Sequence, residues 1–246
     1  VGSPWDFDTQ IGPLANLVNE SLYKEINNKT TNWLVKGRQL NKHLLEPSIA
    51  IGVHKTDACF QTELFGPHLS IVKANNLKEA IEIANSTKFG LTSGLESLNE
   101  DEIDYWKEHI ESGNLYINRS TTGAIVKRQP FGGIKLSAFG QGKKAGGRNY
   151  LTQFIKIESN LSPENSYSYA ETDYKKWYKK YFSKDLEASN IRGQANITKY
   201  LKPKNVVLIL THKSDAQHIP YVILACKTIK VPLTIYSDKE FPSLHT

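Results

Sequence analysis

The sequence predicts an α/β fold in two parts, a larger N-terminal part and a small C-terminal βαβ extension. Three observations support this prediction: short segments of alternating apolar residues, segments with a helical apolar stripe, and a polar stretch at 162–168 that separates the parts. The 246 residues, 39% hydrophobic and 23% charged, are typical of a globular protein and exclude a disordered one. The apolar runs are much shorter than the roughly 20 residues of a membrane helix.

The N-terminal part has the clearer local patterns. Residues 17–26 predict a helix, and residues 68–74 alternate in polarity like a strand. Residues 76–85 place their apolar side chains on one helical stripe. A further helix is predicted over 99–113, followed by a short strand over 114–118.

Capping residues support both of the later helices. Asn76 can cap the helix at 76–85, with Glu79 three residues on as in a capping box. Asn99 can cap the next helix, whose first turn is crowded with acidic residues that suit a helix N-terminus. Gly113 suits the exit of that helix.

A glycine-rich stretch at 119–149 predicts a long ordered loop. Loops of this length inside a compact domain are uncommon unless they are functional. After it, residues 150–158 alternate in polarity and predict a strand. The polar residues 162–168 then predict a linker, which we take as the domain boundary.

The C-terminal extension predicts a βαβ unit. A strand at 204–210, a helix at about 214–230 and a strand at 231–236 follow one another, and such units have parallel strands and a right-handed connection. Before them, residues 172–182 form a basic amphipathic helix with an aromatic stripe. The region from residue 161 carries 13 basic and 8 acidic residues, which indicates a solvated basic face rather than a nucleic-acid site.

Local spacing reveals few catalytic signals. The two cysteines, Cys59 and Cys226, do not make a disulfide framework, and this favours a reducing compartment such as the cytoplasm. The seven histidines are scattered, so we expect no metal site. The sequence contains no methionine, which suggests that modified methionines have been omitted from it, that it is a piece of a longer chain, or both.

Three longer motifs carry a specific resemblance. They are Q-T-E-L-F-G-P at 61–67, G-N-L-Y-I-N-R-S-T-T-G-A-I-V-K-R-Q-P-F-G-G-I-K at 113–135, and K-A-G-G-R-N-Y-L at 144–151. With the opening V-G-S-P-W-D-F-D-T-Q-I-G-P-L, residues 1–158 resemble the C-terminal half of an NAD-dependent aldehyde dehydrogenase. The closest resemblance is to the L-glutamate γ-semialdehyde (Δ1-pyrroline-5-carboxylate) dehydrogenases of proline catabolism. The tail, with G-Q-A-N at 193–196, resembles the extension of the bifunctional proline utilisation flavoenzymes.

The resemblance implies a domain organisation and a homo-oligomer. Residues 1–149 would be part of an aldehyde dehydrogenase catalytic domain, and residues 150–160 an oligomerisation strand that pairs with a neighbouring subunit. Residues 161–246 would be a C-terminal α/β extension. A strand with an exposed alternating edge needs such a partner.

The resemblance also implies six binding residues. Glu63 matches the glutamate that holds the nicotinamide ribose, and Phe65 the aromatic residue beside the nicotinamide. Thr122, Gly123 and Ala124 match the loop that binds the α-carboxylate and amine of the substrate through backbone groups, because small residues let N–H groups approach an anion. Phe131 matches the aromatic residue that lines the aldehyde chain.

In this family a cysteine thiolate attacks the aldehyde, a hydride passes to NAD, and a thioester is hydrolysed with the help of a glutamate base. The nucleophile, the base and the dinucleotide-binding strands precede the matched region, so this chain alone should be inactive. Cys59 lies outside the nucleophile motif and is interpreted as a packing residue, as is Cys226. FAD is implied if a proline dehydrogenase module lies upstream. Two alternatives are a non-catalytic oligomerisation or binding module, and a peripheral membrane contact by the helix at 172–182.

Overall fold

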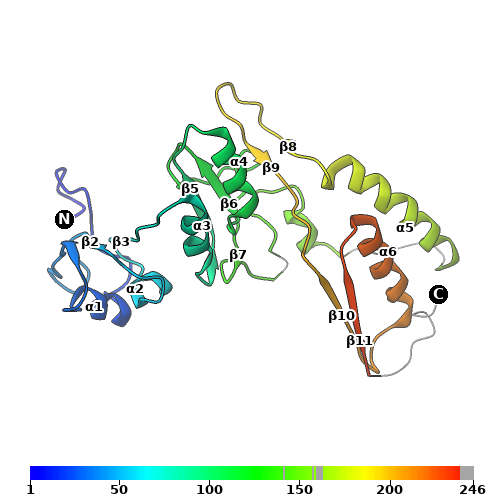
Figure 1. The fold of residues 1–246 in the computed structure, drawn as a ribbon, viewed down its shortest axis with the longest axis horizontal. Helices are drawn as coiled ribbons and strands as arrows, with labels where there is room; N and C mark the ends of the chain where they lie inside the picture. Colours follow the sequence, from blue (N-terminus) through cyan, green and yellow to red (C-terminus); the bar gives the residue numbers. More distant parts are fainter. Residues whose placement is uncertain (141, 157, 159–162, 239–246) are drawn as a thin grey trace. The chain divides into compact units, whose positions relative to one another are not determined.

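The computed structural model describes residues 1–140, 142–156, 158 and 163–238, drawn in Figure 1. The chain forms two compact units. The first contains residues 1–124 and 131–145, and the second contains residues 125–130 and the chain from Gly146 onward. The segment 125–130 therefore belongs to the C-terminal unit, although it lies within the sequence of the first.

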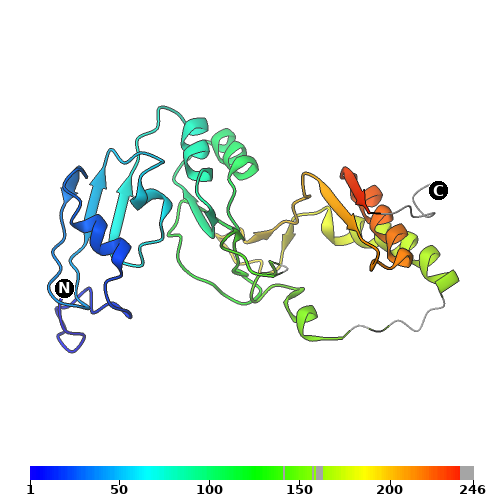
Figure 2. The same cartoon turned by 90° about the horizontal axis from the view of Figure 1, so that it is seen from below.

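The first unit begins with a small mixed sheet. Its helices and strands are α1 (Glu20–Ile26), β1 (Trp33–Val35), β2 (Ser48–Ile51), α2 (Ala58–Gln61) and β3 (His68–Ile71). β1 is antiparallel to β2, and β2 is parallel to β3. Figure 2 shows α1 and α2 close to this sheet. Leu22 and Ile26 of α1 form a buried core with Leu45 and Leu64 from the segments before β2 and β3.

The rest of the first unit contains a βαβ arrangement. Its elements are α3 (Leu77–Asn85), β4 (Phe89–Gly90), β5 (Thr92–Leu95), α4 (Glu100–His109), β6 (Asn114–Ile117) and β7 (Ile134–Lys135). β5 and β6 are parallel and joined by α4, while β4 is antiparallel to β7. Ile81, Trp106 and Ile110 form the core against these strands. The helix predicted at 76–85 and the strand predicted at 114–118 are confirmed.

Both predicted N-caps are confirmed, while one helix end is wrong. The Asn76 side chain accepts a 2.9 Å bond from Glu79 N–H, and the Glu79 carboxylate accepts from Asn75 N–H rather than from Asn76. Asn99 caps α4 through Asp101 N–H at 2.9 Å. α4 ends at His109, before Gly113, because Ile110 already has an extended backbone.

Gly113 has a packing role instead. A Cβ at this position would lie 2.0 Å from the carbonyl oxygen of Gly132 and 2.7 Å from Cα of Gly133. The glycine therefore lets the start of β6 lie directly against the turn that follows Phe131.

The second unit contains the predicted βαβ extension. Its elements are a 3₁₀ helix (Tyr150–Phe154), α5 (Pro163–Trp177) with a π-helical turn (Tyr178–Phe182), β8 (Leu186–Glu187), β9 (Ile197–Thr198), β10 (Val206–Leu210), a 3₁₀ turn (Ala216–His218), α6 (Ile219–Ile229) and β11 (Leu233–Ser237). β10 is parallel to β11, which confirms the βαβ prediction for this region. Leu210 and Ile219 form its core with Leu208, Ile223 and Ile235.

Two predictions for residues 150–168 are wrong. Tyr150–Phe154 is a 3₁₀ helix rather than a strand, because its backbone bonds locally, as from Tyr150 N–H to Gly147 O at 3.2 Å. Ile157 and residues 159–160 of the predicted oligomerisation strand lie outside the described residues. The linker predicted at 162–168 is replaced by α5, which begins at Pro163. Proline is favoured at a first helical position, where its missing N–H has no partner to lose. The boundary between the units instead falls at Gly146.

Candidate functional site

A turn between α2 and β3 carries the residues for which we expect cofactor contacts. At its centre, Leu64 is buried in the core beside α1, and its carbonyl accepts a 2.9 Å bond from the Asn19 side chain. The same Asn19 caps α1 by accepting from Leu22 N–H. Gly66 fits directly against Leu22, since a Cβ there would lie 2.4 Å from Cδ2 of Leu22. The turn is thus fixed to α1 at two points.

Glu63 and Phe65 flank the buried Leu64 and are both exposed. Phe65 has a φ of 54°, which is an unusual backbone conformation for an aromatic residue, and it is 73% exposed. Glu63 makes no hydrogen bond or ion pair within the described part of the chain. A carboxylate that is free in this way can accept bonds from both hydroxyls of a ribose, and an exposed ring can lie beside a planar heterocycle. The two side chains fit the cofactor contacts expected of them.

Cys59 lies near this turn but has the environment of a packing residue. It packs against the core of Leu22 and Leu64, and burial raises the pKa of its thiol. A nucleophilic cysteine needs the opposite shift, towards the thiolate. Cys226 is buried on α6. Both cysteines are free.

The expected substrate loop is anchored to β6. Tyr116 is only 3% exposed, and its hydroxyl donates a 3.1 Å hydrogen bond to the carbonyl of Gly123. Within the loop, Thr122 N–H donates to Ser120 Oγ at 3.3 Å, and the two hydroxyls lie 2.8 Å apart. Gly123 has a φ of 107°, a conformation that L side chains rarely adopt. Thr122, Gly123 and Ala124 are exposed, so the loop is open to solvent while Tyr116 anchors it.

Phe131 is positioned by Ala145 and, through its neighbour Gly132, by Asn114 of β6. Its backbone exchanges two hydrogen bonds with Ala145, at 3.0 and 2.9 Å. Gly132 N–H donates to the Asn114 side chain at 3.1 Å. The ammonium of Lys144 donates to Gly132 O at 2.6 Å, to Asn114 Oδ1 at 3.0 Å and to Gly113 O.

Lys144 is therefore the centre of a polar cluster that joins β6 to the turn after Phe131. Burial lowers the pKa of Lys144 to about 8, whereas its three oxygen acceptors favour the charged form. The residue thus remains largely an ammonium at neutral pH and can serve all three acceptors.

The structure brings four of the six predicted residues to one strand. Tyr116 holds the loop 122–124 through the carbonyl of Gly123, and Asn114 accepts from Gly132, the neighbour of Phe131; both Tyr116 and Asn114 are on β6. No hydrogen bond or ion pair of the described residues joins this group to Glu63 or Phe65. The six residues are therefore described as two separate sets.

Sequence reasoning missed the residues that hold this loop. Tyr116 is on the buried face of the alternating strand N-L-Y-I-N, so the sequence pattern predicts that it is buried. The pattern does not predict which group its hydroxyl bonds to. Asn114 and Lys144 gave no local signal, because the cluster forms between residues about thirty positions apart. Within the described residues, no group of three His, Cys, Asp or Glu side chains could hold a metal ion.

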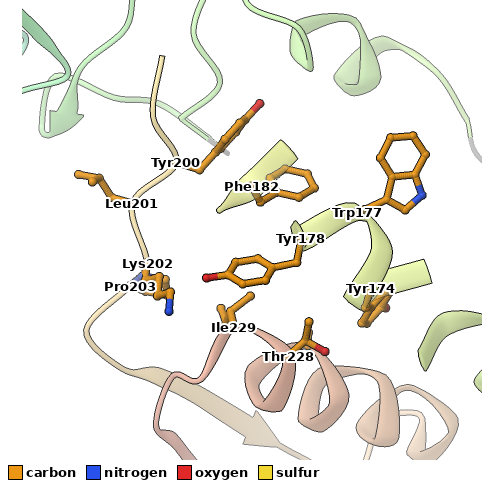
Figure 3. Close-up of a pocket in the computed structure, with 11 residues that line it drawn as sticks. Tyr174, Trp177, Tyr178, Phe182, Tyr200, Leu201, Lys202, Pro203, Thr228 and Ile229 are labelled. Atoms are coloured by element: carbon orange, nitrogen blue, oxygen red, sulfur yellow. The ribbon is translucent and has the colours of Figure 1, made fainter. Parts of the chain in front are cut away.

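A separate cavity of about 350 Å³ lies in the second unit, between the end of α5 and the end of α6 (Figure 3). Its walls include Tyr178, Tyr200 and Ile229. Lys202 lies over the Tyr178 ring, with its ammonium 5.6 Å from the ring centroid. Tyr174 and Tyr178 of the aromatic stripe line this cavity together with residues of α6, whereas Trp177 is 45% exposed. The packing of the two tyrosines favours a docked helix over one that inserts into a membrane. No helix of the described residues is both long enough and apolar enough to span a bilayer.

Comparison with known proteins decides the family. The model of the aldehyde dehydrogenase family matches residues 1–160. This chain belongs to the aldehyde dehydrogenase family. A 1-pyrroline-5-carboxylate dehydrogenase of Bacillus subtilis is 37% identical over 171 residues, covering 65% of this chain and 32% of that relative. The chain thus spans about a third of the length of this relative.

Solved structures extend the similarity into the second unit. Proline Utilization A (PutA) from Corynebacterium freiburgense is 34% identical, with a TM-score of 0.81 over 95% of this chain and 26% of that chain. A 1-pyrroline-5-carboxylate dehydrogenase from Thermus with bound NAD is 34% identical, with a TM-score of 0.50 over 56% of this chain and 27% of that chain. Because the PutA match covers nearly the whole chain, it includes most of the region beyond residue 160.

Proposed function

We propose that this chain is part of an NAD-dependent dehydrogenase that oxidises L-glutamate γ-semialdehyde to L-glutamate in proline catabolism. The observation that carries the proposal is the loop Thr122–Ala124, whose exposed backbone is anchored to β6 by Tyr116. The similarity to 1-pyrroline-5-carboxylate dehydrogenases supports the same substrate class. The proposal concerns the longer protein, since the chain spans about a third of such relatives.

In this proposal the α-carboxylate and amine of the substrate are received by backbone groups of the loop Thr122, Gly123 and Ala124, in which Thr122 N–H already donates to Ser120 Oγ. Donors that are already oriented replace the hydration of the anion, which would otherwise cost several kcal/mol. Phe131 packs along the aldehyde chain and excludes water from it. These contacts hold the substrate by its amino acid end, so they determine which aldehyde is used rather than carry out the chemistry.

Glu63 and Phe65 are proposed to hold the nicotinamide end of NAD. The bound cofactor supplies a two-electron acceptor for the aldehyde hydrogen. The carboxylate of Glu63 would accept from the ribose hydroxyls, and the ring of Phe65 would lie beside the nicotinamide. We assign no catalytic residue to this chain. FAD would belong to a proline dehydrogenase module elsewhere in the protein.

Removing one hydroxyl tests the substrate loop. In the full-length protein, we expect Tyr116→Phe to raise the KM for glutamate semialdehyde roughly tenfold, because the Gly123 carbonyl loses its donor and the loop loosens. The KM for propanal, which lacks the carboxylate, should change little. Tyr105→Phe, on the surface of α4, serves as the matched control and should affect neither substrate. Equal effects of Tyr116→Phe on both aldehydes would contradict the proposal.

An oligomerisation module is the second candidate function. Leu151, Phe154 and Ile155 are 72%, 68% and 59% exposed, and this apolar group lies within the region expected to contact a neighbouring subunit. Light scattering should find an oligomer that becomes a monomer in Leu151→Asp/Phe154→Asp. A monomeric wild-type chain would rule this function out.

We further infer a cytoplasmic location from the two free cysteines. A peripheral membrane contact of α5 is the less favoured proposal, because Tyr174 and Tyr178 of its aromatic stripe line a cavity together with residues of α6. Binding to vesicles with anionic lipids that weakens with salt would support that contact, and no binding would remove it.

A further inference from the structure

The segment Ile125–Pro130 connects the two halves of the expected substrate pocket, yet it packs with the C-terminal unit. Ala124 precedes it and Phe131 follows it, and both belong to the first unit. Lys127 N–H donates a 3.1 Å bond to Gly146 O. Gly146 has a φ of 74°, and a Cβ there would lie 3.0 Å from Cα of Val126. The backbone of the segment thus lies directly on Gly146.

A side chain from the extension holds the same segment. The Nη2 group of Arg128 donates a hydrogen bond to Oε1 of Gln194. Arg128 is half-buried, and its Nε is buried without an acceptor in the described part of the protein. Gln194 is therefore the acceptor that the described structure provides for this guanidinium. The bond from Nη2 to Gln194 lies at an exposed site, and a hydrogen bond to a charged group contributes more to stability than one between neutral groups, so the contact holds the segment.

The loop between β8 and β9 is built to present Gln194. Gln194 N–H donates to Ile191 O at 3.1 Å and closes a turn in which Gly193 has a φ of 78°. On the β8 side, the Glu187 carboxylate accepts from Ser189 Oγ at 2.8 Å and from the backbone N–H of Asn196. The loop is thus held on both sides of Gln194. This arrangement accounts for the motif G-Q-A-N, to which the proposed function assigns no role.

We propose that Gln194 is a positioning residue for the substrate pocket. By holding Arg128, it fixes the segment 125–130, and with it the positions at which Ala124 and Phe131 are presented. The C-terminal extension would thereby determine the affinity for the amino acid end of the substrate without contacting it. The proposal rests on the proposed function, because it needs residues 122–124 and 131 to bind that substrate.

Kinetics of the full-length protein test the effect on substrate binding. Gln194→Ala should raise the KM for glutamate semialdehyde roughly tenfold, the size expected when a bond to a charged group is lost. kcat and the KM values for NAD and propanal should stay close to wild type. Gln194→Glu should restore the KM, because a carboxylate accepts from a guanidinium at least as well as an amide. Arg192→Ala, which removes an exposed arginine from the same loop, is the control and should change none of these values.

Coupling between the two residues tests the route. Arg128→Ala should raise the KM as Gln194→Ala does, and the double variant should be no worse than either, since one contact is removed in each case. Additive effects, or a KM that Gln194→Ala leaves unchanged, would overturn the proposal. A general loss of kcat with both aldehydes would also overturn it, because it would indicate a purely structural role.

Hydrogen exchange in the 246-residue chain gives a readout without turnover. The amide of Lys127 should exchange about tenfold faster in Gln194→Ala than in wild type or Arg192→Ala, because the segment opens more often. Unchanged exchange would overturn the proposal. If the wild-type enzyme does not oxidise glutamate semialdehyde, the proposed function is wrong, and with it the effect on substrate affinity. Exchange would then show only whether Gln194 holds the segment.

Discussion

Gly123 has a backbone conformation that a substituted residue would adopt only with strain. Its φ of 107° is unfavourable for any L side chain, and its carbonyl is held by the buried Tyr116 hydroxyl. In the full-length enzyme, Gly123→Val should lower activity towards glutamate semialdehyde by about two orders of magnitude, through strain and a blocked approach to the backbone N–H groups. Propanal should lose much less. Steady-state kinetics with both aldehydes measure the difference, and equal losses would mean that the loop only supports the fold.

The exposed carboxylate of Glu63 allows a test that leaves the fold intact. Glu63→Gln keeps the size of the side chain and removes the charge that would accept from the ribose hydroxyls. The KM for NAD should rise roughly tenfold, while the protection of the active-site thiol by the aldehyde substrate should remain. Glu82→Gln, an exposed change on α3, is the control. An unchanged KM for NAD would mean that Glu63 is an ordinary surface residue.

Single residues could be proposed from the sequence where they lie in a recognisable motif, and less well where a distant partner holds them. Glu63, Gly123 and Phe131 are in motifs, and their binding roles stay predictions. The sequence predicts Tyr116 as a strand residue, but its bond to Gly123 depends on how the loop folds back. The sequence does not predict the role of Lys144, because its acceptors come from two other segments.

Among the elements, those with local signals were predicted correctly. α3 and α4 begin where asparagine caps them, since a cap bonds within its own first turn. The alternating pattern predicts a strand at Tyr150–Phe154, where the structure has a 3₁₀ helix, because an alternating segment forms a strand only when a partner strand supplies hydrogen bonds. The polar residues around Pro163 are typical of a linker, so they do not predict that α5 begins there.

The Lys144 cluster predicts the stability of β6 and its neighbouring turn. Lys144→Met would leave Gly113 O, Gly132 O and Asn114 Oδ1 without their shared donor, at a cost of about 2–3 kcal/mol in the free energy of unfolding. Lys78→Met, an exposed change on α3, should cost almost nothing. Urea unfolding measures the stability of both variants. Equal urea midpoints for Lys144→Met and Lys78→Met would contradict a stabilising role of the Lys144 cluster.

The hairpin of β8 and β9 should resist acid. Hydrogen bonds from the Ser189 hydroxyl and from backbone N–H groups lower the pKa of Glu187 from 4.5 to about 2. A carboxyl with a lowered folded pKa contributes stability that is complete above its unfolded value and is lost as pH falls through its folded value. The amide NMR signals of Ser189 and Asn196 should therefore titrate near pH 2 rather than near pH 4.5.

Two variants separate this titration from those of nearby acids. Glu187→Gln should abolish this titration. Asp185→Asn, which changes the residue just before β8, should leave it intact. Amide signals that titrate near pH 4.5 in the wild-type chain would show that the carboxylate does not hold the loop.

At the scale of the whole molecule, the division into units could not be predicted from the sequence. Composition pointed to residues 162–168, whereas the units divide at Gly146 and the segment 125–130 joins the second. That segment belongs there because Arg128 bonds to Gln194, far away in sequence, and because Gly146 leaves space for Val126. Such a contact has no local pattern, so only the folded chain reveals that the extension holds the segment 125–130.

The whole chain, tested alone, should not oxidise glutamate semialdehyde. The resemblance places the nucleophilic cysteine in a part of the family that precedes the matched region, and the environment of the two cysteines present does not replace it. Burial raises the pKa of Cys59, which disfavours its thiolate, and Cys226 is only 6% exposed, so an aldehyde has little access to it. NADH absorbance should therefore stay flat with the 246-residue chain and rise with the full-length enzyme under the same conditions.

Turnover by the chain that disappears only in Cys59→Ser would show that Cys59 is a nucleophile after all. Turnover that survives in Cys59→Ser/Cys226→Ser would show that the reaction needs no cysteine of this chain, contrary to the thiol chemistry expected of the family.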